Sequence, residues 1–160
     1  MDLPELTELD LSNLILLNNL FGVNGEAFNG VIGLKNIKKL ILNNLKIISE
    51  GVKTLDVSQC SRLEYLDMSN SSYTNFKLPL SGSIKYLNLS NTNINHLGNS
   101  IKPFENQTSL EEINLSGCID LIEVNIINCP SIKVLKVPNS VRTLSIINCE
   151  SLEEIDCNYS

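Results

Sequence analysis

Side chains able to bind a metal ion or to attack a substrate are few and scattered in this sequence. His96 is the only histidine, and the residues around it form no catalytic or metal-binding motif. No C-x-x-C pair is present, and Cys118 and Cys129 stand too far apart to be read as a zinc-binding pair. The glycines match neither the dinucleotide-binding nor the P-loop spacing. The sequence therefore predicts no catalytic residue, no metal site and no cofactor, and we do not expect an enzyme.

The placement of the other polar side chains depends on one recurring spacing of apolar residues. An apolar residue is followed by two more, three and five positions later, as in Leu63, Leu66 and Met68. Side chains two residues apart lie on one face of a β-strand. We therefore expect Leu66 and Met68 to point inward, and Tyr65 and Asp67 to point outward. The spacing begins at Leu6, Ile37, Val52, Leu63, Ile84, Leu110, Leu121, Ile132, Val141 and Leu152.

The copies of this spacing predict stacked coils with strands on two sides. One coil cannot bury its own apolar edge, so neighbouring coils must stack. Most copies are expected to form strands on one face. Three copies begin midway between the others and are expected to form extended segments on the back, starting at Val52, Leu121 and Val141. The residue at the bend after a strand is expected to turn inward, as for Ser71, Thr92 and Cys118. Longer turns are expected where the rhythm breaks: Phe21–Gly33, Asn70–Ser83 and Asn91–Ser109.

The repeated spacing resembles that of the leucine-rich-repeat superfamily along nearly the whole chain. Cys129–Val141, followed by Cys149–Leu152, is similar to BspA-like repeats of microbial surface proteins, although that family's Ala-Phe pair occurs only once, at Ala27. Leu115–Cys118 and Ser151–Ile155 are similar to repeats of plant immune receptors, so the subclass stays open. The resemblance implies one domain over residues 1–160, a leucine-rich-repeat solenoid of about seven irregular coils. It implies short parallel β-strands on the concave face, a mostly irregular or extended convex side, and little helix.

The resemblance also implies that the concave face binds a protein, because both kinds of relative use their repeats for binding rather than catalysis. Tyr65 and Tyr86 hold one position in successive coils, so we expect them to lie side by side, and tyrosine is enriched in binding hot spots. We predict the following partner-binding residues: Tyr65, Asp67, Tyr86, Asn88, Glu112 and Asn114. Two alternatives stay open for this face, a solvated polar surface and acid–base catalysis by neighbouring carboxylates.

The strand pattern also predicts which side chains share a row across that face. The central row is expected to read Asp10, Ile41, Asp67, Asn88, Asn114, Lys136 and Asp156. The adjacent row is expected to read Glu8, Lys39, Tyr65, Tyr86, Glu112, Val134 and Glu154. Carboxylates are dispersed in both rows, which does not favour a catalytic pair.

Composition narrows the class of partner. A net charge of −6 disfavours binding to nucleic acid and to anionic membranes, and no run of about 20 apolar residues could span a bilayer. We therefore expect a protein partner, no nucleic acid and no membrane insertion. The regular cysteine positions favour buried thiols in a reducing compartment, and the first residues lack a secretory signal pattern. A cytoplasmic location is expected, with an extracellular surface as the alternative.

Other architectures and functions stay open at this level. The last coil carries no polar cap, which favours truncation, a following domain or end-to-end self-association. A microbial surface or adhesion repeat is one alternative function. A parallel β-helix acting on polysaccharide is another, but such an enzyme needs Asp clustered with Lys or Arg in one groove. Arg62 and Arg142 are the only arginines, and neither stands in an acidic cluster.

Overall fold

The computed structural model describes residues 5–17, 36–48, 54–94 and 104–159, and its fold consists of short β-strands. No helix occurs among these residues, and every strand pairing within them is parallel. The strands are β1 (Glu8–Asp10), β2 (Ile15–Leu17), β3 (Lys39–Ile41), β4 (Lys46–Ile48), β5 (Thr54–Asp56), β6 (Tyr65–Asp67), β7 (Asn75–Lys77), β8 (Tyr86–Asn88), β9 (Glu112–Asn114), β10 (Glu123–Ile127), β11 (Val134–Pro138), β12 (Thr143–Ile147) and β13 (Glu154–Tyr159).

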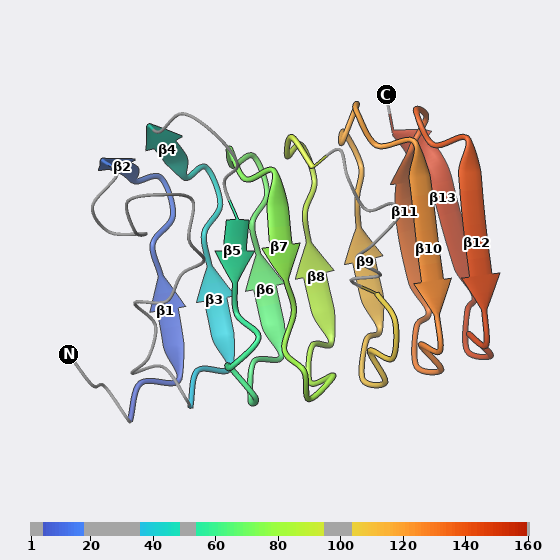
Figure 1. The fold of residues 1–160 in the computed structure, drawn as a ribbon, viewed down its shortest axis with the longest axis horizontal. Helices are drawn as coiled ribbons and strands as arrows, with labels where there is room; N and C mark the ends of the chain where they lie inside the picture. Colours follow the sequence, from blue (N-terminus) through green and yellow to red (C-terminus); the bar gives the residue numbers. More distant parts are fainter. Residues whose placement is uncertain (1–4, 18–35, 49–53, 95–103, 160) are drawn as a thin grey trace.

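The main sheet has seven strands in the order β1-β3-β6-β8-β9-β11-β13. Figure 1 shows these strands side by side along the long axis of the molecule. Each strand begins two residues after the start of a copy of the apolar spacing, so the strand positions and the parallel arrangement predicted from the sequence are confirmed. The register matches the two predicted rows residue for residue, with Tyr65 opposite Tyr86 and Asp67 opposite Asn88.

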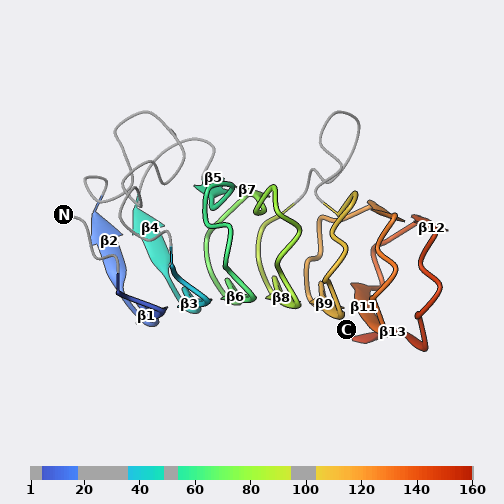
Figure 2. The same cartoon turned by 90° about the horizontal axis from the view of Figure 1, so that it is seen from below.

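Three two-stranded sheets, β2-β4, β5-β7 and β10-β12, complete the architecture. Figure 2 shows β5, β7 and β12 on the side opposite the seven-stranded sheet. Strands β5, β10 and β12 belong to the copies that begin at Val52, Leu121 and Val141, so the extended segments predicted for the back are confirmed. The prediction that Asn70–Ser83 is only a turn is wrong, because β7 lies within it and pairs with β5. The arrangement is that of a β-rich repeat whose sheets are not closed.

The core lies between the two sides and is made of the inward residues of the apolar spacing. Leu66, Leu87 and Ile113 are opposite one another on adjacent strands, and all three are buried. Burying a side chain of this size stabilises the fold by about 1.5–3 kcal/mol. The back adds the rings of Phe76 and Phe104, whose centroids lie 5.9 Å apart and whose planes are tilted by 39°. Stacking of the coils therefore gives a continuous apolar interior.

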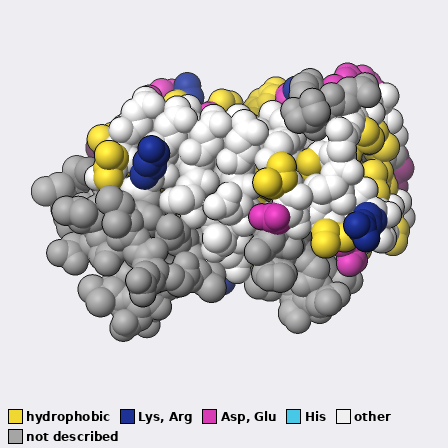
Figure 3. All heavy atoms as spheres, turned by 90° about the horizontal axis from the view of Figure 1, so that it is seen from above, with side chains coloured by type: hydrophobic (Ala, Val, Ile, Leu, Met, Phe, Trp, Pro, Cys, Tyr) yellow, Lys and Arg dark blue, Asp and Glu magenta, His cyan; other side chains and the backbone are white. Residues whose placement is uncertain are grey.

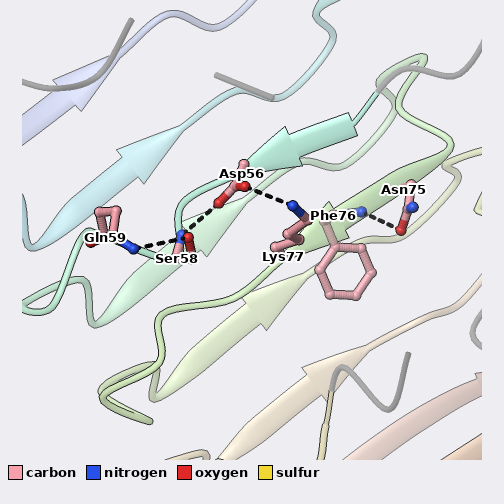
Figure 4. Close-up of polar contacts among 6 residues, drawn as sticks. All are labelled: Asp56, Ser58, Gln59, Asn75, Phe76 and Lys77. Carbon is pink, nitrogen blue, oxygen red and sulfur yellow. Dashed lines mark hydrogen bonds and ion pairs between the residues drawn. The ribbon is translucent and has the colours of Figure 1, made fainter. Parts of the chain in front are cut away.

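The turn after β5 shows how side chains tie the back together (Figure 4). The backbone N–H of Ser58 donates to Oδ1 of Asp56 over 3.0 Å, and Nζ of Lys77 donates to Oδ2 of Asp56, also over 3.0 Å. Burial alone would raise the pKa of Asp56, but the bonds from Ser58 and Lys77 outweigh it and hold this pKa below its usual value. Asp56 therefore joins its own turn to the neighbouring strand β7.

The cysteine prediction is confirmed only in part. All five cysteines are free thiols, and Cys60, Cys118 and Cys129 are buried. Cys149 is half-buried, and the prediction that Cys157 is buried is wrong, because it is exposed. Cys157 lies on β13, the outermost strand of the main sheet among the described residues, so no neighbouring coil covers it there.

Candidate functional site

The residues at the carboxyl ends of the main strands are held by a repeated turn. In each turn a side-chain oxygen accepts the backbone N–H of the serine two residues later. For Asp67 this bond to Ser69 is 2.9 Å long, and for Asn88 the bond to Ser90 is 3.1 Å. The same bond joins Asp10 to Ser12 and Asn114 to Ser116. Asp and Asn favour such turns because their short side chains reach back to the local backbone.

One residue further on, the backbone enters the left-handed region in every one of these turns. Asn13, Asn70 and Asn91 have φ between 54° and 61°, and Gly117 has φ 70° in the next coil. Asn44 shares this conformation, with φ 53°, although Ile41 of its coil has no side-chain oxygen to form such a turn. Asparagine tolerates this conformation better than other residues with a Cβ. The side chains also bond to each other, because Nδ2 of Asn91 donates to Oδ1 of Asn70 over 3.0 Å.

A second set of asparagines forms a ladder on the back. Asn148 donates from Nδ2 to Oδ1 of Asn128, and Asn128 donates in the same way to Asn106, over 2.7 and 2.9 Å.

The first set of asparagines lies at the other edge, toward which the main strands point in Figure 1. Figure 3 looks onto that edge, and its central part consists mostly of neutral polar side chains and backbone. The heavy use of asparagine in this chain thus has a structural cause.

In three consecutive coils the residue that follows the left-handed position turns inward, as predicted, whereas Leu14, which follows Asn13, is exposed. Ser71, Thr92 and Cys118 are all buried. Oγ of Ser71 donates to the carbonyl of Leu42 over 2.6 Å, and Sγ of Cys118 donates to the carbonyl of Leu89 over 3.1 Å. Ser71 and Cys118 therefore each satisfy a backbone acceptor of the preceding coil. Thr92 instead donates to the carbonyl of Leu89 in its own coil.

The outward face of the main sheet carries a row of large side chains at its centre. The rings of Tyr65 and Tyr86 have centroids 6.3 Å apart and are tilted by 43°. Nζ of Lys39 lies 5.5 Å from the centroid of the Tyr65 ring, within the range of a cation–π contact. On the other side, Nζ of Lys136 lies 3.1 Å from Oε1 of Glu112. The predicted adjacency of the two tyrosines is therefore confirmed.

Five of the six predicted partner-binding residues meet at one open hollow of about 160 Å³. It is lined by Tyr65, Tyr86, Leu87, Asn88, Glu112 and Asn114. Tyr86 is 43% exposed and forms the most accessible part of this lining. Asp67 does not line the hollow. It is only 7% exposed, and besides its turn bond it accepts a bond of 3.3 Å from Nδ2 of Asn43.

The electrostatics of this face keep the phenol of Tyr65 neutral. Burial raises the pKa of Tyr65, and the nearby charges of Asp67 and Glu112 raise it further. Its hydroxyl is therefore protonated at neutral pH and can donate a hydrogen bond. The thiol of Cys129 is also neutral, because burial raises its pKa to about 11. Among the described residues, no group of three or more His, Cys, Asp or Glu side chains is placed to hold a metal ion. His96 lies outside the described residues.

A row of alternating charge lies along the amino ends of the main strands and was not among the predictions from the sequence. Backbone hydrogen bonds join its members in order: Lys38, Glu64, Lys85, Glu111, Lys133 and Glu153. Nζ of Lys85 lies 2.8 Å from Glu64, and Nζ of Lys133 lies 3.3 Å from Glu111. Each of these residues stands immediately before a strand of the main sheet, from β3 to β13. Their alternating signs could therefore have been read from the sequence.

A second open hollow, of about 380 Å³, lies along this row. Its lining includes Lys38, Arg62, Glu64 and Lys85, together with serines. From the sequence, Arg62 was noted only as an arginine outside acidic clusters. The structure places it beside two lysines and one glutamate, so the lining of this hollow carries a net positive charge.

Comparison with known proteins adds no assignment. No protein-family model and no curated protein matches the chain. None of the described segments is a helix long and apolar enough to cross a membrane.

Proposed function

We propose that this chain is a leucine-rich-repeat solenoid that acts as a non-enzymatic interaction module and binds a protein on the concave face of its main sheet. The observation that carries the proposal is the cluster of Tyr65, Tyr86 and Glu112 around one hollow. Tyrosine supplies a large, rigid and amphipathic contact surface, which is why it is enriched in binding hot spots.

Support for the solenoid comes from the register of the main sheet. Each coil contributes one strand, and the inward position that all seven strands share is filled by Leu or Ile: Leu9, Leu40, Leu66, Leu87, Ile113, Leu135 and Ile155. In repeat proteins each unit contacts only its neighbours and buries its apolar faces against them. An array of parallel strands leaves one broad side-chain surface open for a partner.

Support for a protein partner comes from charge and from the rigidity of the face. The net charge of −6 opposes binding to phosphate-rich nucleic acid. The turn bonds of Asn88 and Asn114 fix the backbone beneath the hollow, so little conformational entropy would be lost on binding. We also propose a cytoplasmic location, which the buried free thiols of Cys60, Cys118 and Cys129 support.

The test uses the double variant Tyr65→Ala/Tyr86→Ala. A partner is first captured with the wild-type chain from the native organism, identified and purified, and its affinity is then measured by isothermal titration calorimetry. We expect the double variant to bind at least about tenfold more weakly, a loss of about 1.4 kcal/mol. Both side chains are outward on the sheet, so circular dichroism and the unfolding midpoint are expected to change little.

The matched control is Ile119→Ala/Ile122→Ala. These side chains are also large and exposed, but they lie between β9 and β10, away from the hollow. This control is expected to bind like the wild type. Unchanged affinity in the tyrosine double variant, or an equal loss in the isoleucine control, contradicts the proposal.

A further inference from the structure

We propose that the hollow between Tyr65, Tyr86 and Glu112 holds the cationic side chain of an arginine or lysine of the partner. This inference rests on the proposed function, because it specifies the chemistry of the group that the same face would recognise. Three features of the hollow carry it: the aromatic lining, the single carboxylate, and the rigid amide floor.

The lining combines aromatic surface with one negative charge. Glu112 is the only charged residue among the six that line the hollow. Aromatic ring faces attract cations electrostatically, and a guanidinium can in addition stack flat on a phenol ring. Lys39 already lies over the ring of Tyr65, which demonstrates that this row accommodates a cation against a tyrosine.

The carboxylate has capacity for a second cation. Lys136 donates to Oε1 of Glu112 over 3.1 Å, and a carboxylate offers about four acceptor positions on its two oxygens. Oε2 is therefore available as an acceptor for an incoming ammonium or guanidinium group. The ion pair with Lys136 is part-exposed, at 27% for Lys136 and 37% for Glu112. Rearranging such a pair costs little, because exposed ion pairs contribute at most about 1 kcal/mol.

The floor of the hollow is fixed before any ligand arrives. Asn88 accepts the N–H of Ser90, and Asn114 accepts both the N–H and the hydroxyl of Ser116, over 3.0 and 2.7 Å. These bonds commit the side-chain oxygens to the turns and hold the two amide groups in place. A cation would therefore enter a preformed site, and the negative charge of the chain would favour its approach.

The experiment is a nuclear magnetic resonance titration of the isotopically labelled chain with blocked pentapeptides. One peptide carries arginine at the centre of four glycines, a second carries lysine, and a third carries citrulline, the neutral isostere of arginine. We expect saturable shifts at the backbone amides of Asn88, Glu112 and Asn114 with a cationic peptide. The citrulline peptide is expected to bind at least about fivefold more weakly, since it lacks the charge. Comparison of the first two peptides shows whether guanidinium or ammonium is preferred.

Matched variants locate the site. Glu112→Gln removes the carboxylate of the hollow and is expected to weaken binding of the better peptide about fivefold. Glu111→Gln makes the same charge change one residue away and also removes an ion pair, that with Lys133, but Glu111 does not line the hollow. It is expected to leave the affinity unchanged. Tyr86→Leu keeps apolar bulk without the phenol ring and is expected to weaken binding about threefold.

Each outcome decides the inference. Saturable shifts that fall with citrulline and with Glu112→Gln, but not with Glu111→Gln, support it. Absence of saturable shifts with both cationic peptides, equal binding of citrulline, or equal effects of the two glutamine variants overturn it. If it is overturned while Tyr65→Ala/Tyr86→Ala still weakens binding of the native partner, the proposed function stands with a different recognition chemistry. If that double variant also has no effect, the proposed function fails separately.

Discussion

The side-chain amide of Asn91 lies where a Cβ of Gly117 would be, so these two residues of adjacent turns fit together only because one of them is glycine. Gly117 also has φ 70°, in the left-handed region that residues with a Cβ rarely adopt. The preceding coils place asparagine at the equivalent position: Asn13, Asn44, Asn70 and Asn91. The glycine therefore takes the place that asparagine holds in these preceding coils and keeps their positive φ.

Gly117→Ala is expected to destabilise the fold by about 2 kcal/mol, because the new Cβ is strained at positive φ and overlaps Oδ1 of Asn91. Urea unfolding followed by circular dichroism measures this. Asn91→Gly removes the overlapping side chain and keeps a residue that tolerates positive φ. In that background, Gly117→Ala is expected to cost about 1 kcal/mol less. Equal costs in both backgrounds would show that the overlap contributes nothing.

Acid is expected to weaken the fold partly through Glu64. The hydrogen bond and the charge of Lys85 hold the pKa of Glu64 below its usual value of 4.5. The folded state therefore binds fewer protons than the unfolded state, so this contribution is complete above 4.5 and is lost as pH falls through the lowered pKa. Glu64→Gln is expected to make the urea midpoint less dependent on pH between about 6 and about 3.

The control for this pH effect is the same substitution in a Lys85→Ala background, where the partner of Glu64 is absent. There Glu64→Gln is expected to change the pH dependence less than it does in the wild type. Sodium chloride at about 1 M screens the exposed pair of Glu64 and Lys85 and is expected to reduce the difference between wild type and Glu64→Gln. A Glu64→Gln profile that runs parallel to the wild-type profile would contradict the assignment.

Thiol reactivity is expected to separate the cysteines by position. Cys157 is exposed and should react rapidly with a disulfide reagent, whereas Cys118 and Cys129 should react only when the chain opens. Burial raises the pKa of both inner thiols, that of Cys129 to about 11, so little thiolate is present at neutral pH. Stopped-flow measurements are expected to show one fast phase that Cys157→Ser removes. Reaction of Cys129 at the rate of Cys157 would contradict the buried position.

The main sheet could be predicted from the sequence because its signal is local. The inward positions of Leu66, Leu87 and Ile113 follow from strand alternation, and the strand register follows once equivalent copies are aligned. The hollow was partly predictable for the same reason, since residues that hold one position in successive coils must be neighbours. The sequence-based prediction treated Asn88 and Asn114 as partner-binding residues. It did not include that their side-chain oxygens accept the N–H groups of Ser90 and Ser116 in turns.

The back of the molecule was predicted less completely because one of its copies of the spacing begins with two aromatic residues. Tyr73, Phe76 and Leu78 follow the same spacing of three and then two and are all buried, and β7 begins two residues after Tyr73. The contact of Phe76 with Phe104, which belongs to a later coil, is not encoded locally. The position of Cys157 was wrong for a related reason, since the apolar spacing predicts which side chains turn inward but not whether a neighbour covers them.

The alternating charges that begin at Lys38 and Glu64 constrain how such a chain can change in length. Excising the coil that contains Lys85 would bring Glu64 next to Glu111, and excising the next coil would bring Lys85 next to Lys133. Like charges placed opposite each other on adjacent strands destabilise a sheet. Insertion or deletion in pairs keeps every neighbour oppositely charged. Duplication of two coils at a time is therefore the route by which this array could grow without electrostatic conflict.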